Sequence, residues 1–174
     1  MSLLVWLPLH GNLDNLGLSP AKFSNTSTST ITVASTGKTS SQSYQRAAKN
    51  TAGVIASDIN FYFPQDFSMA CWCKITELAG SSANGIITHH DHVVGGAGLT
   101  VKYIDASTCY ASMNTGTGDG HRTYQSYYGT TNIFGAWHHL ALTYNRNTTT
   151  YTLYVDGKAE KTVSYTDTAA PRPF

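Results

Sequence analysis

The sequence predicts an all-β protein built from antiparallel strands. Segments in which apolar and polar residues alternate recur along the chain, as expected for strands with one buried face. Glycine, asparagine and aspartate separate these segments at turns, and one short helical turn is the most helix that we expect. Regularly spaced strands with short turns favour a sandwich or a barrel over a parallel β-α-β arrangement.

The first informative segment is Trp137–Tyr144, which alternates as a strand. Leu140, Leu142 and Tyr144 fall on one face of this strand, and the residues between them fall on the other. The polar run at Asn145–Thr148 then breaks the alternation and predicts a turn.

A second and a third strand follow this turn. Tyr151–Val155 alternates again, and Asp156-Gly157 is a strong hairpin signal, because a type I′ turn needs positive φ at both central residues. Ala159–Tyr165 is the predicted third strand. Together the three strands predict an antiparallel meander.

The rest of the chain predicts further strands and one short helical turn. Leu3–Leu9 is a first strand, and the Ser- and Thr-rich segment Ser24–Ser43 is a β-hairpin region with polar outer faces. Tyr44–Thr51 has the composition of a short helical turn. The remaining predicted strands are Val54–Ile59, Phe67–Ile75, Gly85–His89, Leu99–Tyr103, Cys109–Met113 and Arg122–Tyr128.

Three segments of the chain resemble known proteins. The residues W-H-H-L-A-L-T-Y at Trp137–Tyr144, followed by L-Y-V-D-G-K at Leu153–Lys158, resemble the laminin-G-like form of the concanavalin A-like lectin/glucanase superfamily. D-F-S-M-A-C-W-C-K at Asp66–Lys74 is similar to an early core strand of that family. The opening Val5–Ser19 resembles the start of such jelly-roll proteins in tailed bacteriophages, especially those of gut bacteria.

The resemblance implies an antiparallel two-sheet β-sandwich of jelly-roll type. We expect residues 1–174 to form a single domain of this kind, which fits an ordinary domain length. Family members continue beyond the position of Ala169–Phe174 into further strands. Either the chain is the N-terminal part of a longer protein, or its last strands come from elsewhere.

Composition narrows the classes of function. Charged residues make up 12% of the chain and the net charge is +1, so we expect no binding to nucleic acid. No apolar stretch reaches the roughly 18 residues of a membrane span, and the N-terminus lacks the basic region of a signal peptide. Cys71 and Cys73 are two apart on one strand face, which suits a disulfide poorly, and Cys109 lies in another strand. We expect three free thiols and folding in the reducing cytosol.

Catalysis of the superfamily's glucanase type is not expected. The resemblance implies an E-x-D-x-x-E strand for such enzymes, and a retaining mechanism needs two carboxyl groups about 5–5.5 Å apart. The chain has two glutamates, Glu77 and Glu160, in different segments. We therefore expect that the protein is not an enzyme.

His89-His90-Asp91-His92 is the densest group of side chains able to bind a metal. His90 and His92 share one face of a strand end, and a third ligand for zinc or nickel could come from His121 or Asp119. The alternative is a rim loop with incidental histidines, and it is the one we favour. Calcium, which the resemblance also implies, needs six to eight oxygens, and the chain has few clustered acids. We expect no metal and no cofactor.

A tyrosine-rich segment is the best candidate for ligand binding. The chain has eleven tyrosines against six phenylalanines, and four candidate residues cluster in one segment: Arg122, Tyr124, Gln125 and Tyr128. Tyr124 and Tyr128 share one strand face while Tyr127 points to the other, so an exposed tyrosine face could stack on sugar rings. His90 and His92 complete the candidate set. The alternative is that one face is core and the other an ordinary wetted sheet.

The resemblance implies a non-catalytic virion module, part of a bacteriophage tail or capsid appendage, that adheres to host-surface or mucus glycan. It would fold in the host cytoplasm and be exposed on the particle. Its partners would be that glycan, other virion proteins and further copies of itself. The alternative is a purely structural decoration or oligomerisation domain that binds other virion proteins.

Overall fold

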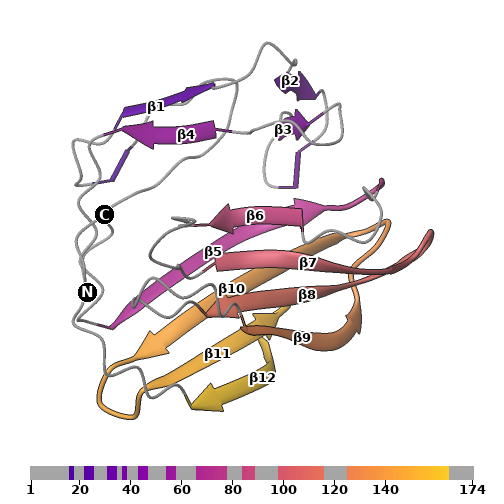
Figure 1. Cartoon of the computed structure of the whole chain (residues 1–174). Coiled ribbons are helices and arrows are strands. Elements are labelled where there is room, and N and C mark those ends of the chain that lie inside the picture. Colours follow the sequence, from indigo (N-terminus) through magenta and orange to yellow (C-terminus); the bar gives the residue numbers. More distant parts are fainter. Residues whose placement is uncertain are drawn as a thin grey trace. The chain divides into compact units, whose positions relative to one another are not determined.

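The computed structural model describes residues 16–17, 22–25, 31–34, 37–38, 43–46, 54–57, 66–77, 84–88, 98–115 and 125–164. Every regular element in these residues is a strand (Figure 1). The chain divides into two compact units, Met1–Phe61 with Phe174, and Tyr62–Pro173. The expectation of one domain over residues 1–174 stays a prediction.

The first unit contains two small antiparallel sheets. β1 (Lys22–Asn25) pairs with β4 (Val54–Ser57), and β2 (Ile31–Ala34) pairs with β3 (Ser43–Arg46). The helical turn predicted for Tyr44–Thr51 is therefore wrong at its start, because residues 44–46 belong to β3. Cross-strand pairing with β2 overrides a weak helix propensity over three residues. Residues 47–51 lie outside the described part.

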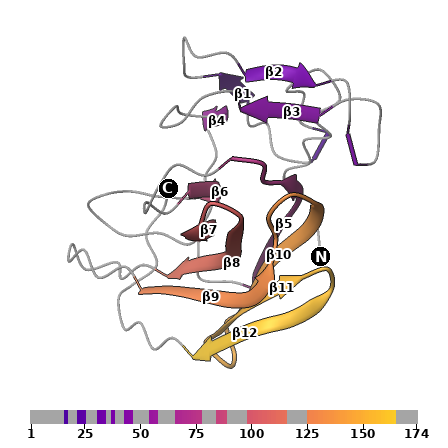
Figure 2. The same cartoon turned by 90° about the vertical axis from the view of Figure 1, so that its right-hand side faces the viewer.

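The second unit contains two four-stranded antiparallel sheets, which Figures 1 and 2 show from two sides. One sheet has the order β6-β7-β8-β9 and the other has the order β12-β11-β10-β5. The strands of the first are β6 (Asn84–Thr88), β7 (Gly98–Asp105), β8 (Thr108–Thr115) and β9 (Gln125–Asn132). Those of the second are β5 (Phe67–Lys74), β10 (Trp137–Asn145), β11 (Thr150–Val155) and β12 (Lys158–Ser164).

The two sheets pack face to face around one core. The alternation predicted from the sequence places Leu140 and Leu142 of β10 inward, as it does Leu153 of β11, and all three are fully buried. The first sheet contributes core side chains from β7, from β8 and from the residue that follows β9. Its buried core residues are Leu99, Val101, Cys109, Ala111, Met113 and Ile133. The predicted all-β, antiparallel two-sheet sandwich is confirmed.

The meander of β10, β11 and β12 is also confirmed, together with its tight turn. Asp156 has a φ of 51° and Gly157 a φ of 82°, the positive values that a type I′ hairpin requires. β11 and β12 pair from Val155↔Lys158 onward, with a bulge between Leu153 and Tyr154.

The strand boundaries differ most at β9. Prediction began this strand at Arg122 and ended it at Tyr128, whereas the described strand runs from Gln125 to Asn132. The side chain of Asn132 explains the late end. Its Oδ1 accepts hydrogen bonds from the backbone N–H groups of Cys109 and Phe134, both at 3.1 Å. The first predicted strand, Leu3–Leu9, lies outside the described residues.

Cys71, Cys73 and Cys109 are free thiols, as predicted. Cys71 and Cys73 lie on the same, inward face of β5, where the burial alternates along the strand. Within the described residues there is no helix long and apolar enough to span a membrane.

Candidate functional site

The outward face of the sheet β6-β7-β8-β9 carries Tyr128, one of the two tyrosines that the sequence singled out. Val101 in β7 and Ala111 in β8 are fully buried in the core, so their neighbours Lys102 and Tyr110 point outward. In β9, Tyr127 packs against the core, and its neighbour Tyr128 points to the opposite face.

Tyr128 is 50% exposed and is one of the large side chains most open to solvent among the described residues. It stands opposite Ser112 in the register of β8 and β9. Ser112 in turn stands opposite Thr100 of β7, and their hydroxyl oxygens lie 2.5 Å apart. Both hydroxyl side chains are buried. The exposed ring therefore stands beside a fixed, hydrogen-bonded part of the sheet.

Tyr110 and Lys102 extend this surface. They stand opposite each other across β7 and β8, Lys102 exposed and Tyr110 half-buried. Tyr110 pairs with Asn132 of β9, four residues along that strand from Tyr128, across the register shift between Tyr110 and Ser112. We call Tyr110, Tyr128 and Lys102 the tyrosine face. Two phenol rings and a cation on a rigid sheet can stack on a flat apolar ligand surface and donate hydrogen bonds at its rim.

The other predicted ligand residues are placed only in part. Gln125 is the first residue of β9, opposite Thr115 of β8. Arg122, Tyr124, His90 and His92 lie outside the described residues, as do the alternative metal ligands, His121 and Asp119. In the part of the chain that the structure describes, no three His, Cys, Asp or Glu side chains gather closely enough to hold a metal ion. The expectation of no metal and no cofactor stays a prediction.

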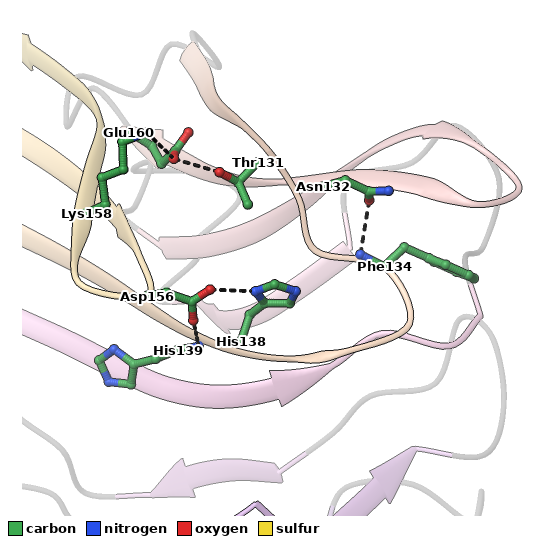
Figure 3. Close-up of polar contacts among 8 residues, drawn as sticks. All are labelled: Thr131, Asn132, Phe134, His138, His139, Asp156, Lys158 and Glu160. Atoms are coloured by element: carbon green, nitrogen blue, oxygen red, sulfur yellow. Dashed lines mark hydrogen bonds and ion pairs between the residues drawn. The ribbon is translucent and has the colours of Figure 1, made fainter.

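Glu160, one of the two glutamates considered for catalysis, joins the edges of the two sheets (Figure 3). It stands in β12, and its side chain is only 2% exposed. Its Oε2 accepts hydrogen bonds from the backbone N–H and the hydroxyl of Thr130 in β9, at 2.9 and 3.0 Å. Its Oε1 accepts one from the Thr131 hydroxyl at 2.7 Å. Each of these donors favours the charged form of the carboxylate.

This hydrogen bonding decides what Glu160 can do chemically. Hydrogen bonds lower the pKa of the Glu160 carboxyl to about 2. The backbone N–H of Thr130 has the largest effect on this pKa, and the hydroxyl of Thr131 has the second largest. A general acid must carry a proton near neutral pH, so Glu160 cannot fill that role. The ammonium group of Lys158, 3.9 Å from Oε1 and well exposed, adds little. The hydrogen bonds of Glu160 hold the adjoining edges of β9 and β12 together.

Asp156 occupies a similar structural position in the β11–β12 turn (Figure 3). Its Oδ1 accepts a hydrogen bond from the backbone N–H of His139 at 2.9 Å, and its Oδ2 lies 2.7 Å from Nδ1 of His138. The His139 N–H first, and then the His138 ring, lower the pKa of the Asp156 carboxyl. The two histidines of the W-H-H segment are thus tied to the turn by main-chain and side-chain contacts.

Sequence inspection missed one exposed aromatic side chain. Trp72 in β5 lies on the outward face of the other sheet and is 43% exposed. The outward direction of Trp72 could have been predicted from the sequence, because this residue alternates with the inward-facing Cys71 and Cys73. Treating Asp66–Lys74 only as a core strand hid the residue that faces away from the core.

Comparison with known proteins gives one family match. Residues 48–173 match the sequence profile described as the concanavalin A-like lectin/glucanases superfamily, in its laminin-G-like form. This match covers all eight strands of the two larger sheets, together with β4. No curated protein and no solved structure matches the chain.

Proposed function

Because the chain belongs to the concanavalin A-like lectin/glucanases superfamily, we propose that it is a non-catalytic, carbohydrate-binding module of a tailed-bacteriophage virion. It binds a glycan of the host surface or of mucus on the tyrosine face. A lectin-type fold is compatible with carbohydrate binding, but the fold alone does not assign a function, so the proposal depends on the surface.

The observation that carries the proposal is the exposed ring of Tyr128, with Tyr110 and Lys102 on the same outward face of the sheet. A pyranose ring has one face of C–H groups that stacks on an aromatic ring, while its hydroxyls need polar partners nearby. A tyrosine offers both an apolar ring and a polar tip. Arg122, Tyr124 and Gln125 stay predicted ligand residues, the first two outside the described part of the chain.

The virion context has a separate basis, which is the resemblance of Val5–Ser19 to the start of bacteriophage jelly-roll proteins. A phage appendage carries many copies of its subunits. Weak binding by one domain then becomes firm attachment through avidity, so a shallow surface is sufficient for this role.

The test is binding of the full chain, biotinylated and tetramerised on streptavidin, to gut-bacterial cells, mucin and an array of bacterial surface polysaccharides. We expect Tyr128→Ala to weaken binding by about 1 kcal/mol per site, or about fivefold. Tyr128→Phe keeps the ring and should retain most of the binding. Lys161→Ala, an exposed change in β12 on the other sheet, is the matched control and should have no effect.

If the intact tetramer binds none of these surfaces, the proposal is wrong, and the purely structural alternative takes its place. That alternative predicts instead that the chain is retained on other virion proteins or on copies of itself.

A further inference from the structure

The outward face of the sheet β12-β11-β10-β5 carries a second aromatic surface, on the opposite side of the sandwich from the tyrosine face. Its centre is Trp72 of β5, 43% exposed. Trp72 stands opposite His139 of β10 in the strand register. The two ring centroids are 5.2 Å apart with an angle of 61° between the planes, so the rings meet edge to face.

The main chain next to this indole is held firmly. The backbone N–H of His139 donates to Oδ1 of Asp156 at 2.9 Å, and the backbone N–H of Asp156 donates to the carbonyl oxygen of His139 at 2.8 Å. The His138 ring pairs with the other oxygen of the same carboxylate. A ligand that stacks on Trp72 therefore meets a side chain whose cross-strand partner is already ordered, which reduces the entropic cost of binding.

Small side chains occupy the sheet positions next to the indole. The next row of the same face contains Ala70 of β5 and Ala141 of β10, directly opposite each other, followed by Tyr154 of β11. The two methyl groups rise little above the sheet, whereas Trp72 and Tyr154 stand on either side of them. Residues two apart on a strand are roughly 6.6 Å apart, a spacing that suits one six-membered ring.

Polar groups that could bind the hydroxyls of a sugar lie in the next row of this face, two residues along β5 and β10 from the two alanines. It consists of hydroxyl side chains in register across all four strands: Ser68, Thr143, Thr152 and Thr162. The hydroxyls of Thr152 and Thr162 lie 3.1 Å apart and are hydrogen-bonded. Hydroxyl groups both donate and accept, which matches the hydroxyls of a neutral sugar. The row itself carries no charge, so it gives no preference to an anionic ligand.

We propose that Trp72, with Ala70, Ala141 and Tyr154, forms a second glycan-binding surface, which binds the C–H face of a pyranose in a neutral polysaccharide. The domain then has two binding faces on opposite sides of one sandwich and cross-links polysaccharide chains instead of holding only one. The cross-linking rests on the proposed function, whereas the Trp72 surface has its own residues and its own test.

The test uses the full chain with soluble neutral polysaccharides: a β-1,3-glucan, a mannan and a galactomannan. Intrinsic fluorescence comes from all three tryptophans of the chain. We expect a shift of the emission on binding, and its reduction in Trp72→Tyr would assign it to Trp72. Trp72→Ala should weaken binding at this surface about fivefold or more. Tyr128→Ala should leave it unchanged.

Ala70→Glu places a larger, charged side chain beside the indole at an exposed position of the edge strand β5 and leaves Trp72 in place. It should also abolish binding at this surface, and unchanged thermal unfolding would show that the fold is intact. Wild-type protein should precipitate the polysaccharide that it binds. The Trp72→Ala and Tyr128→Ala variants should each lose precipitation.

Two results would overturn the inference. If the wild type binds a polysaccharide and Tyr128→Ala abolishes all of that binding, while Trp72→Ala and Ala70→Glu change nothing, the Trp72 surface is not a site and the proposed function stands. If the wild type binds none of the three polysaccharides and its emission does not change, the Trp72 surface does not bind neutral glycan. The tyrosine face is then judged by its own experiment on cells and mucin.

Discussion

Gly129 in β9 lies next to the side chain of Glu160 in β12, where the edges of the two sheets meet. A Cβ atom at Gly129 would lie 3.0 Å from Glu160 Cβ and 3.1 Å from its Oε2. A side chain at position 129 would therefore require Glu160 to move by a few tenths of an ångström relative to the donors of Thr130 and Thr131. The hydrogen bonds of the buried Glu160 carboxylate thus depend on the small size of Gly129.

We expect Glu160→Gln to destabilise the fold by about 1–3 kcal/mol at neutral pH, because the amide nitrogen cannot accept the hydrogen bonds that one carboxylate oxygen now accepts. Urea denaturation of both proteins measures this difference. Lys158→Ala is the control, and it should change stability by no more than about 0.5 kcal/mol, because its contact is exposed and long.

The same pair of proteins gives a pH test. The folded-state pKa of Glu160, about 2, lies below the ordinary value of 4.5. The stability from its charged form is therefore fully present above the ordinary value, and it is lost as the pH falls toward 2. The difference between wild type and Glu160→Gln should be constant near neutral pH and shrink in acid. A difference independent of pH would contradict this account.

Sequence inspection was least successful in predicting the positions and roles of individual side chains. Alternation correctly placed Tyr128 outward and Tyr127 toward the core. It could not find the role of Glu160, because the donors in β9 are about 30 residues away in sequence and meet it only across the edges of two sheets. Trp72 could have been found, since alternation alone puts it on the outer face.

At the scale of elements, the β11–β12 hairpin follows directly from local chemistry. Alternation set the faces of β10 and β11, and Asp-Gly set the turn, because both residues tolerate positive φ. The predicted helical turn at Tyr44 failed for the opposite reason. Its helix propensity was weak, and antiparallel pairing with β2 places residues 44–46 in a strand.

We expect Gly157→Ala to destabilise the protein by about 1–2 kcal/mol, the cost of placing a residue with a Cβ in the left-handed region. A Cβ atom there would meet nothing within 4 Å, so backbone strain is the only cause. Gly157→Asn should cost less, because asparagine tolerates this conformation. Thermal or urea unfolding of the two variants measures the effect. Equal costs for both would mean that φ is not the cause.

On the scale of the whole molecule, the three thiols report on the environment of the core. Cys109 is fully buried and burial raises its pKa to about 11, and the pKa of Cys73 is raised by its hydrogen bond with Cys71. We expect three reactive thiols in denaturant without reductant, and no reaction of Cys109 in the native protein. Fewer than three in denaturant would indicate a disulfide.

We also expect no hydrolysis of β-glucans by the whole protein. Glu160 is held as a charged structural carboxylate, and a retaining mechanism needs a second acid close to the first. Reducing-sugar release from β-1,3- and β-1,4-glucans should equal that of a mock purification. Turnover by the pure protein that Glu77→Gln removes would refute this expectation.

The strand order β12-β11-β10-β5 has a consequence for how fast the protein folds. β10, β11 and β12 are joined by short turns, and hairpins of this kind form in microseconds. β5 must then find β10 from far away along the chain: Asp66, next to β5, accepts a hydrogen bond from the backbone N–H of Arg146, 80 residues distant. The entropy of closing that loop is lost before the pairing is gained, so docking of β5 should limit the refolding rate. Until it docks, the backbone N–H and C=O groups on one edge of β10 are unpaired, which makes the meander of β10, β11 and β12 the segment most prone to aggregation during synthesis.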